Sequence, residues 1–367
     1  KSAPTVTTAK GPMPQAQAAK LLARRWANAS PDLKQLAVLE EQATGVPLIA
    51  GNDVRLLFDG PATLRAMIDA VRNAKTSINL ETYIFDQDPI GLQFAELLME
   101  KRRQGVVVNV MYDSVGTIGT PKAFFDNMRA AGVNMLAFNP INPAKAKGNW
   151  SINNRDHRKI LVVDGQVAYT GSQNIIHRSY NKKKNLRKGL EWKDLMVRGT
   201  GSVVTELNAV FVSDWYSETD DLLLDETPAA LEHTAGPMYA QVVPSGPGFE
   251  TENNLRLFNH LIYNANHRVV ISSPYFVPDE SLLHAITTEA QAGVRVQLFV
   301  GETSDQFLAQ HAQNSYYSEL ARAGVEIYRY SSPTVLHAKF VLVDDIVSVI
   351  GSSNMDERSF ALNLEVS

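Results

Sequence analysis

The chain has 367 residues, a formal net charge of −4 and no cysteine, with 44% hydrophobic and 20% charged residues. This composition is typical of a globular protein, and the length predicts two domains. The lack of cysteine excludes a disulfide scaffold, a thiolate metal site and a cysteine nucleophile, while the negative net charge does not favour nucleic acid, because proteins that bind it usually present a basic face.

Residues 1–49 predict a flexible leader followed by helices. The first 17 residues are rich in Ala, Pro, Thr and Lys, which is typical of a flexible segment, and helices are expected over 18–27 and 31–44. From residue 50 onward the pattern alternates between helix and strand. We therefore expect a first domain over 50–225, a linker with acidic residues, Pro and Gly over 226–248, and a second domain over 249–367.

The two domains are predicted to be copies of one another, because a set of landmarks recurs in the same order. Helix ends of the form Gly-Val, each followed by a strand, occur at Gly105 and Gly132 and again at Gly293 and Gly324. Each half reads strand–helix–strand–helix–strand and then a hairpin, which is an α/β pattern with helices covering a sheet. The first half has an additional loop over 139–156. We expect two pseudo-symmetric α/β/α sandwich halves that face each other.

The strongest signal is one motif that occurs once in each half. Six residues stand at identical spacing in both copies, and two such matches in one chain are very specific, whereas a lone His-x-Lys would carry no information. The first copy comprises His157, Lys159, Asp164, Gly171, Ser172 and Asn174. The second copy comprises His337, Lys339, Asp344, Gly351, Ser352 and Asn354.

Each motif predicts a β-hairpin. Apolar runs flank Asp164-Gly165, which is a favoured two-residue turn. This turn makes Val163 face Gln166 and His157 face Ser172, and the same construction in the second motif places its His opposite its Ser. Residues two apart on a strand share a face, so the His and Lys of each motif lie together, as do the Ser and Asn.

Such a cluster of polar side chains suits a phosphate. Lys159 and Lys339 supply positive charge, and the Ser and Asn residues supply neutral donors. A His beside them can act as nucleophile or as proton donor, and two facing clusters give one His for each task. Because the lysines would hold the charge that develops on the phosphoryl oxygens, no metal or other cofactor is expected. Asp164 and Asp344 lie at the turns, far from the His, so we expect a structural role for both.

These residues resemble the double HKD signature of the phospholipase D superfamily. Three further segments are similar to bacterial cardiolipin synthases, namely Glu81-Thr82-Tyr83-Ile84-Phe85, Ser273-Pro274-Tyr275-Phe276-Val277-Pro278 and Asp356-Glu357-Arg358-Ser359-Phe360. The resemblance covers about residues 54–367, and it implies a phospholipase D-type fold with the active site at the interface of the two halves. Relatives continue beyond the position of Glu365, so we expect the second domain to be truncated at its C-terminus.

The resemblance also implies a ping-pong mechanism through a covalent phosphohistidine. By resemblance His157 attacks the phosphorus, and His337 protonates the departing alcohol and then activates an incoming alcohol or water. The family places an acid after each Asn to orient the opposite His, and the candidates are Asp194 and Glu365. Glu365 stands in an apolar strand, where an unpaired carboxylate would be costly. We therefore expect Glu365 to reach His157 and Asp194 to reach His337.

We therefore expect a phospholipid phosphatidyltransferase or phospholipase D that acts at a membrane surface of the bacterial cell envelope, on the periplasmic or secreted side rather than in the cytoplasm. Two alternatives stay open. One is a nuclease or other phosphodiesterase of the same superfamily. The other is a catalytically inactive lipid-binding protein, against which the two intact motifs argue. The sequence does not determine the headgroup, the balance between alcohol and water as acceptor, or the oligomeric state.

Two further sets of residues each allow two interpretations. The basic segment Lys182–Lys188 could dock on anionic headgroups or form a solvated loop. Four aromatic residues near the motifs could line an acyl or glycerol pocket, or could simply belong to the core. They are Tyr83, Phe85, Tyr275 and Phe276.

Overall fold

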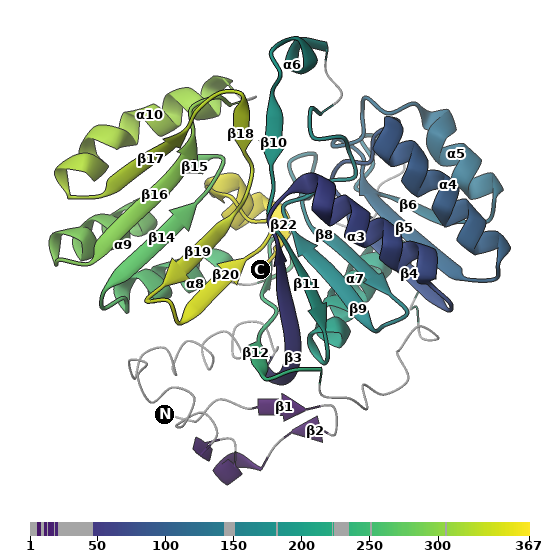
Figure 1. Cartoon of the computed structure of the whole chain (residues 1–367), viewed down its shortest axis with the longest axis horizontal. Coiled ribbons are helices and arrows are strands. Elements are labelled where there is room, and N and C mark those ends of the chain that lie inside the picture. The colour runs from purple at the N-terminus through teal and green to yellow at the C-terminus, as the bar shows by residue number, and fades with distance from the viewer. Residues whose placement is uncertain are drawn as a thin grey trace.

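The structure is a computed structural model that describes residues 6–8, 11–12, 14–17, 19–20, 47–142, 151–180, 183–221, 223, 235–249, 252–304 and 307–367. Two α/β units lie side by side, and the C-terminus lies between them (Figure 1). Most residues of the expected N-terminal helices, residues 143–150 of the expected loop and residues 226–234 of the expected linker lie outside the described residues. In the described part, no helix is both long and apolar enough to cross a membrane.

The first unit is built around a mixed sheet with the strand order β2-β1-β3-β11-β9-β8-β4-β5-β6. Its strands are β1 (Val6–Thr8), β2 (Gly11–Pro12), β3 (Leu48–Leu57), β4 (Ser77–Thr82), β5 (Val107–Asp113), β6 (Asn134–Phe138), β8 (Lys159–Val163), β9 (Val167–Gly171) and β11 (Met196–Thr200). Its longer helices are α3 (Gly60–Asn73), α4 (Pro89–Arg103), α5 (Lys122–Ala130) and α7 (Val203–Thr219). Three shorter elements of the first unit do not belong to this sheet, namely β7 (Arg155–Asp156), α6 (Lys183–Arg187) and β10 (Glu191–Lys193). Two short pieces of the expected leader, β1 and β2, thus extend this sheet beyond β3.

The second unit is built around a sheet with the order β17-β16-β14-β19-β20. Its strands are β14 (Arg268–Ser272), β16 (Arg295–Gly301), β17 (Glu326–Tyr330), β19 (Phe340–Val343) and β20 (Val347–Ile350), and its helices are α8 (Asn253–Tyr263), α9 (Glu280–Gln291) and α10 (Phe307–Arg322). Shorter elements are β12 (Met238–Ala240), β13 (Pro244–Ser245), β15 (Phe276–Val277), β18 (Thr334–Leu336), β21 (Met355–Asp356), the π-helix η3 (Arg358–Leu362) and β22 (Asn363–Val366). Within residues 226–248, β12 pairs with β3 of the first unit and β13 pairs with β22, so both strands tie this segment to the two units.

The predicted repeat is confirmed. The order β4-α4-β5-α5-β6 and the hairpin β8-β9 recur as β14-α9-β16-α10-β17 and the hairpin β19-β20. The local signals recur too, because Asp88 caps α4 and Asp279 caps α9 by accepting backbone N–H groups. The glycines that follow these helices, Gly105 and Gly293, have φ of 92° and 102°, which a residue with a side chain rarely adopts.

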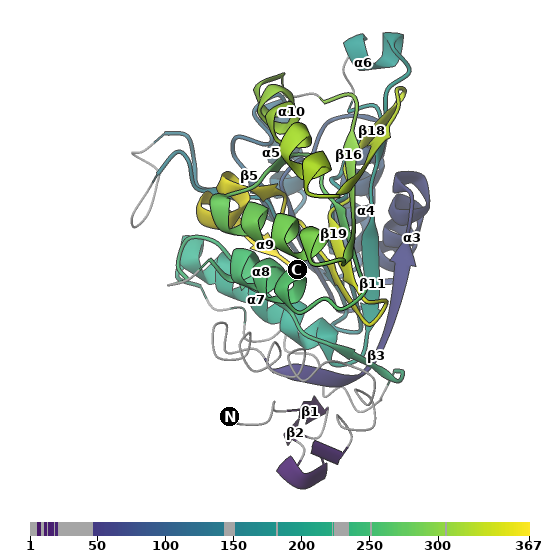
Figure 2. The same ribbon diagram turned by 90° about the vertical axis from the view of Figure 1, so that its left-hand side faces the viewer.

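The two sheets differ in how helices cover them. In the first unit, α3, α4 and α5 pack on one face, where Leu161 of β8 lies, and α7 packs on the other, where Ile160 lies. In the second unit, α8, α9 and α10 share one core, and Figure 2 shows them side by side on one side of the strands. On the opposite face, Phe299 and Phe340 pack against Leu336 and against Leu195 of the first unit. The described helices of the second unit therefore lie on one face of its sheet.

The register predicted for both hairpins is wrong by one residue. Val163 pairs with Val167 rather than with Gln166, and Val343 pairs with Val347 in the second hairpin. The two-residue turn itself is present, since Gln166 N donates to Val163 O at 3.0 Å. Gln166 then stands as one extra residue before the ladder begins, which is a bulge next to the turn. As a result His157 does not face Ser172, and His337 does not face Ser352.

The two units join through two pairs of strands, and in each pair a strand of one unit lies beside the motif histidine of the other unit. β7 of the first unit pairs with β22 of the second, and β10 of the first pairs with β18 of the second. The chain then continues from β7 into His157, whose N–H donates to Leu364 O at 3.0 Å, and from β18 into His337, whose N–H donates to Lys193 O at 2.9 Å. Both motif histidines therefore lie at the interface between the units.

Candidate active site

Two histidines and two lysines meet where the units join. His157 and Lys159 lie between the end of β7 and the start of β8, and His337 and Lys339 lie between β18 and β19. All four side chains are buried. Each lysine ammonium donates to the carbonyl oxygen of the histidine two residues before it, Lys159 to His157 O and Lys339 to His337 O. The two copies of the motif therefore build the same local arrangement.

Each histidine is held by a carboxylate from the opposite half. His157 Nδ1 lies 3.0 Å from Glu365 Oε1, and His337 Nδ1 lies 2.6 Å from Asp194 Oδ1. Both contacts that the sequence led us to expect are present. A carboxylate accepts a hydrogen bond from Nδ1–H, so this tautomer leaves the lone pair on Nε2. Nε2 is the atom that can attack a substrate or take its proton.

The motif serines hold these carboxylates. Ser172 Oγ donates to Asp194 Oδ1 at 2.7 Å and accepts from the N–H of Leu195 at 3.0 Å. In the second half Ser352 Oγ donates to Glu365 Oε2 at 2.5 Å and accepts from the N–H of Val366 at 3.0 Å. The sequence led us to expect serine donors for a phosphate, but in this structure each hydroxyl proton goes to an acid. A Ser–carboxylate–His chain therefore recurs twice.

The motif glycines let the segments that carry Asp194 and Glu365 come close. A Cβ at Gly171 would lie 2.4 Å from Leu195 O, and a Cβ at Gly351 would lie 2.2 Å from Val366 O. Such approaches to backbone atoms are too short for any side chain to fit without movement of the strand. Each glycine stands directly before its serine, and each of these carbonyls belongs to the residue after the acid. Glycine therefore allows the approach on which the Ser–carboxylate contact depends.

The motif asparagines differ in their contacts. Asn174 Oδ1 accepts from the N–H of Ile84 at 3.2 Å, and its Nδ2 donates to the hydroxyl of Tyr180 at 3.1 Å. In contrast, Asn354 Oδ1 is buried and has no hydrogen-bond partner among the described residues. Buried polar atoms are usually paired, so Asn354 Oδ1 could accept a hydrogen bond from a donor on a ligand, whereas only Nδ2 could donate to a phosphoryl oxygen.

Burial lowers the pKa of both lysines, and repulsion by Lys159 lowers that of Lys339 further. Burial lowers the pKa of Lys159 to about 8, although Glu365 and other carboxylates oppose it. Burial and the charge of Lys159 lower the pKa of Lys339 to about 7. An anion placed between these ammonium groups would reverse the effect, because it would stabilise their charged forms. The site is thus electrostatically suited to a phosphate.

The histidines are neutral at neutral pH, and the acids are ionised. Burial lowers the pKa of His157 to about 4, and the charges of Lys159 and Lys339 act in the same direction against Glu365. Burial and Lys339 likewise lower the pKa of His337. Burial alone would raise the pKa of Glu365 and Asp194, but their contacts with the histidines, serines and lysines outweigh it and lower both. A neutral imidazole beside an ionised carboxylate is the resting state of a nucleophile.

The motif aspartates lie at the far turns. Asp164 accepts the backbone N–H groups of Thr76 at 2.7 Å and Ser77 at 3.0 Å. Asp344 accepts those of His267 and Arg268, both at 2.8 Å. Each carboxylate thereby ties its hairpin turn to the start of the neighbouring strand, β4 or β14. These contacts are structural, as the sequence led us to expect.

Sequence reasoning did not identify Arg158, which stands between His157 and Lys159. This residue is 1% exposed. Its Nε donates to Glu365 O at 2.9 Å, one terminal nitrogen donates to Asp214 of α7, and the other donates to Ser245 O at 3.2 Å. It therefore links three elements around Glu365. The sequence could have indicated this role, because Arg158 is a charged residue within a motif that was expected to be buried.

The aromatic residues divide between site and core. The ring of Tyr83 meets His157 edge-on at 5.1 Å between centroids, and the ring of Tyr180 meets His337 in the same way at 6.0 Å. Phe85 and Phe276 are fully buried in the cores of the first and second units. The two phenylalanines therefore belong to the hydrophobic cores, whereas Tyr83 lies next to His157 and lines the site. Tyr180 was not among the residues expected from the sequence.

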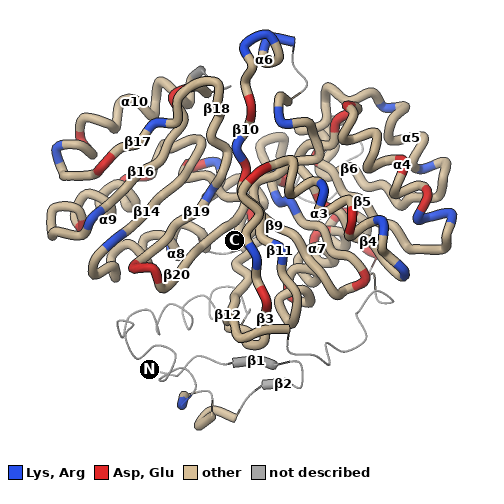
Figure 3. The backbone as a smooth tube through the Cα atoms, in the orientation of Figure 1, with Lys and Arg blue, Asp and Glu red and all other residues tan. Residues whose placement is uncertain are grey.

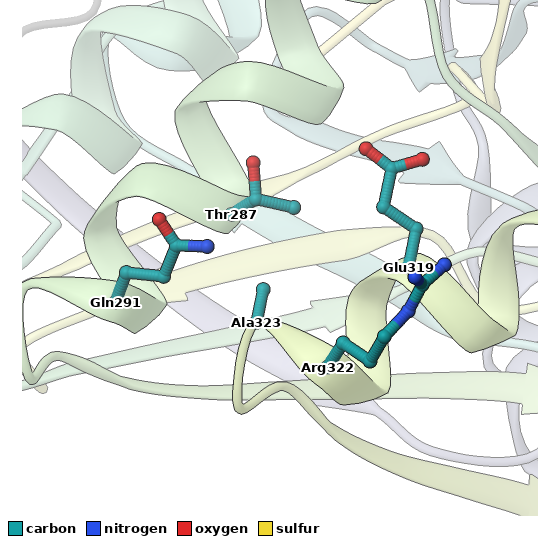
Figure 4. A pocket seen from close by; sticks show the side chains of 5 residues that line it. All are labelled: Thr287, Gln291, Glu319, Arg322 and Ala323. Atoms are coloured by element: carbon teal, nitrogen blue, oxygen red, sulfur yellow. The ribbon is translucent and has the colours of Figure 1, made fainter.

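Other parts of the described structure show less. The described residues contain no group of three or more His, Cys, Asp or Glu side chains that could hold a metal ion. A hollow between α9 and α10 is lined by Thr287, Gln291, Glu319, Arg322 and Ala323 (Figure 4). None of the motif residues lines this hollow.

The chain is similar to proteins that are already known. A family model described as "Cardiolipin synthase, PLD-like domain" matches residues 67–215 and 258–367. A cardiolipin synthase of Alkalihalophilus pseudofirmus is 35% identical over 322 residues, and cardiolipin synthase A of Pseudomonas fluorescens is 37% identical over 325 residues. These matches cover 87% and 88% of this chain but only 63% and 65% of the relatives, so the chain spans less than two thirds of their length.

Two solved structures share the fold. Phosphatidylserine synthase of Haemophilus influenzae superposes with a TM-score of 0.64 at 16% identity, over 90% of this chain and 85% of that one. Polyphosphate kinase of Porphyromonas gingivalis superposes with a TM-score of 0.54 at 11% identity, over 86% of this chain and 44% of that one. At such low identity the likeness concerns the fold alone.

Proposed function

Because the chain belongs to the family of cardiolipin synthases with PLD-like domains, we propose that it transfers a phosphatidyl group between alcohols through a covalent phosphohistidine. The observation that carries the proposal is the doubled arrangement at the interface. Two histidines, each oriented by a carboxylate of the opposite half, lie beside two lysines. One histidine can form the covalent bond while the other moves the proton.

In the first step, Nε2 of His157 attacks the phosphorus of a phospholipid diester. The bond from phosphorus to the headgroup alcohol breaks, a P–N bond forms, and His337 gives a proton to the departing alcohol oxygen. His337 must be protonated for this task, although burial lowers its pKa in the free protein. Binding of the anionic diester beside it stabilises the imidazolium and so raises its pKa.

In the second step, the proton returns. Neutral His337 takes a proton from an incoming alcohol or water, whose oxygen attacks phosphorus while the P–N bond breaks and His157 is regenerated. An alcohol acceptor gives a new phospholipid, and water gives phosphatidic acid. Lys159, Lys339 and the Nδ2 amide group of Asn354 donate to the phosphoryl oxygens in both steps, and Asp194 and Glu365 keep the two imidazoles in the required tautomer.

The substrate class follows from the relatives rather than from the geometry. Relatives at 35–37% identity are cardiolipin synthases, so the donor is a phospholipid such as phosphatidylglycerol and the acceptor is a lipid alcohol or water. We further propose that the protein acts in contact with a membrane surface of the bacterial envelope, on the periplasmic or secreted side. The inactive lipid-binding alternative is disfavoured because both motifs assemble fully at one interface.

The experiment is a product analysis with two substrates. The protein is incubated with phosphatidylglycerol vesicles labelled in the phosphatidyl group, with and without EDTA, and separately with labelled single-stranded DNA. We expect labelled cardiolipin or phosphatidic acid, equal yields with and without the chelator, and intact DNA. Cleaved DNA without lipid turnover would instead assign the site to a nuclease, and activity that needs an added metal ion would contradict the mechanism.

A further inference from the structure

A short arm projects from the interface between the two units. It comprises α6 and β10, residues 183–193, and its helical tip stands above the rest of the molecule in both orthogonal views (Figures 1 and 2). β10 runs from this tip down to the interface, where it pairs with β18. The residue after β10 is Asp194, which holds His337. The arm is therefore joined directly to the active site.

The arm concentrates positive charge. Between Arg178 and Lys193 the sequence has seven lysines and arginines and a single acid, Glu191, although the whole chain has a net charge of −4. The basic side chains of the tip are exposed, and the tip is marked by blue segments in Figure 3. They are Lys183, Lys184, Arg187 and Lys188. Leu186, which lies among them, is 56% exposed, so the tip presents cations around one apolar side chain.

The arm is anchored on the active site. Asn185 is buried and its Nδ2 donates to Ser179 O at 3.1 Å. Below the tip, Trp192 stacks on Tyr180 with 4.4 Å between ring centroids, within an apolar cluster that also includes Leu190 and Val335. Tyr180 in turn meets the ring of His337. These contacts fix the distance between the charged tip and the catalytic histidines.

We propose that this arm is the surface by which the protein docks on an anionic phospholipid bilayer. Lys183, Lys184, Arg187 and Lys188 contact the headgroups, and Leu186 enters the interfacial layer. The inference rests on the proposed function, because a phosphodiester in a bilayer lies at headgroup level and the site must be brought to it. Within residues 183–193 no aromatic side chain is exposed on which a nucleic-acid base could stack, so the lipid surface fits the tip better.

The test compares two sets of charge removals in the full chain. The arm variant carries Lys183→Gln, Lys184→Gln, Arg187→Gln and Lys188→Gln. The matched control removes four exposed charges elsewhere, with Arg65→Gln, Lys75→Gln, Arg103→Gln and Arg256→Gln. Cosedimentation is measured with vesicles of phosphatidylcholine alone and of phosphatidylcholine mixed with phosphatidylglycerol. We expect the arm variant to bind the mixed vesicles about 10²-fold or more weakly than the wild type, and the control variant to bind them nearly as tightly as the wild type.

Further readouts separate this inference from the proposed function. His157→Ala should bind the mixed vesicles like the wild type, whether or not the protein turns lipid over. Turnover of a short-chain phosphatidylglycerol below its micelle concentration should be the same in the arm variant and the wild type, if the site acts as proposed. Equal vesicle binding by the arm variant and the wild type would overturn the inference. So would retention of single-stranded DNA by the arm without binding to anionic vesicles.

Discussion

The two halves carry the same motif but support it differently. In the first half the residue between His and Lys is Arg158, which is buried and bonded to Asp214 and to Glu365 O. In the second half it is Ala338, which lies in a small apolar cluster with Leu195 and Leu336.

The neighbouring strands differ in the same way. Glu81 of β4 pairs with Ile160, three residues after His157, and Ser272 of β14 pairs with Phe340, three residues after His337. Glu81 and Ser272 therefore occupy equivalent positions. Burial and the nearby carboxylates of Asp156 and Asp214 raise the pKa of Glu81 well above its ordinary value, whereas Ser272 Oγ simply donates to Ala338 O at 3.1 Å.

The comparison separates what the chemistry needs from what the packing needs. The positions that are equal in both halves include those that hold a histidine, a lysine or an acid at the interface. The positions that differ pack against the motif. The first half has the buried charged residues Arg158 and Glu81 there, and the second half has the small neutral residues Ala338 and Ser272. We therefore expect symmetric effects on catalysis and asymmetric effects on stability.

The largest expected effect is symmetric. His157→Ala and His337→Ala should each lower kcat by about 10³-fold or more, because neither the covalent step nor the proton transfer has a substitute. The measurement is turnover of labelled phosphatidylglycerol, with circular dichroism as a check on folding. His284→Ala, an exposed histidine on α9, is the matched control and should keep full activity.

The two histidine variants should still differ in one respect. If His157 is the nucleophile, His337→Ala still forms an acid-labile phosphoprotein, although slowly because the departing alcohol lacks its proton donor, while His157→Ala cannot form it. Samples quenched in denaturant at neutral or alkaline pH, where the P–N bond survives, give this directly when the substrate is radiolabelled in its phosphate. Loss of activity in one variant alone would refute the shared site, and a labelled species that persists in His157→Ala would exchange the two roles.

The acids should also act symmetrically. Glu365→Gln and Asp194→Asn keep the shape of each side chain but remove the charge that fixes the tautomer, so kcat should fall by about 10²–10⁴-fold. Pre-steady-state kinetics can separate the two steps. We expect Glu365→Gln to slow mainly the formation of the phosphoprotein, and Asp194→Asn to slow both its formation and its breakdown, because His337 moves a proton in each step. Wild-type turnover in either variant would show that its carboxylate only packs against the interface.

Substitutions at Arg158 and at its counterpart Ala338 should differ in their effects on stability. Arg158→Met leaves the Asp214 carboxylate buried without its cation, and removing one partner of such a pair typically costs about 3–5 kcal/mol. The free energy of unfolding in urea measures this effect. The double variant Arg158→Met/Asp214→Asn should recover part of the loss, because the unpaired charge is gone. Ala338→Ser, the matched change in the second motif, should cost far less.

The smallest expected effect is on the pH dependence of stability. Burial and the charge of Asp214 raise the pKa of Asp156 from 3.8 to about 7. Between these values the folded state binds more protons than the unfolded state, so this group makes the protein less stable as the pH rises toward 7. His157 acts oppositely, since its pKa is lowered from 6.5 to about 4 and its contribution to stability is lost as the pH falls through that window.

The variant Asp156→Asn isolates the first of these two groups. Its free energy of unfolding should fall less between pH 4 and pH 7 than that of the wild type, with a difference in slope of at most about 1.4 kcal/mol per pH unit. Urea titrations at several pH values give both curves. Parallel curves would mean that Asp156 is ionised throughout and that Arg158 compensates its charge fully.

The sequence by itself determined the repeat, the fold class and the residues that meet at the interface. Spacing can do this because a hairpin, a glycine after a helix and an aspartate cap are local features, set by residues a few positions apart. The doubled motif then implied that two equal half-sites face each other, and the resemblance to a family pointed to Asp194 and Glu365.

Only the tertiary structure decided the hydrogen-bond partners of the motif residues. The bulge at Gln166 stands beside Asp164, whose carboxylate is bonded to Thr76 and Ser77, nearly ninety residues earlier in the chain. The serines bond to acids rather than remaining open to a phosphate, because the segments that contain Asp194 and Glu365 approach the motif glycines. The pairing of Arg158 with Asp214 has the same origin, because it joins a motif residue to helix α7. A buried arginine needs an acidic partner, but which acid lies within reach is decided only when the elements pack together.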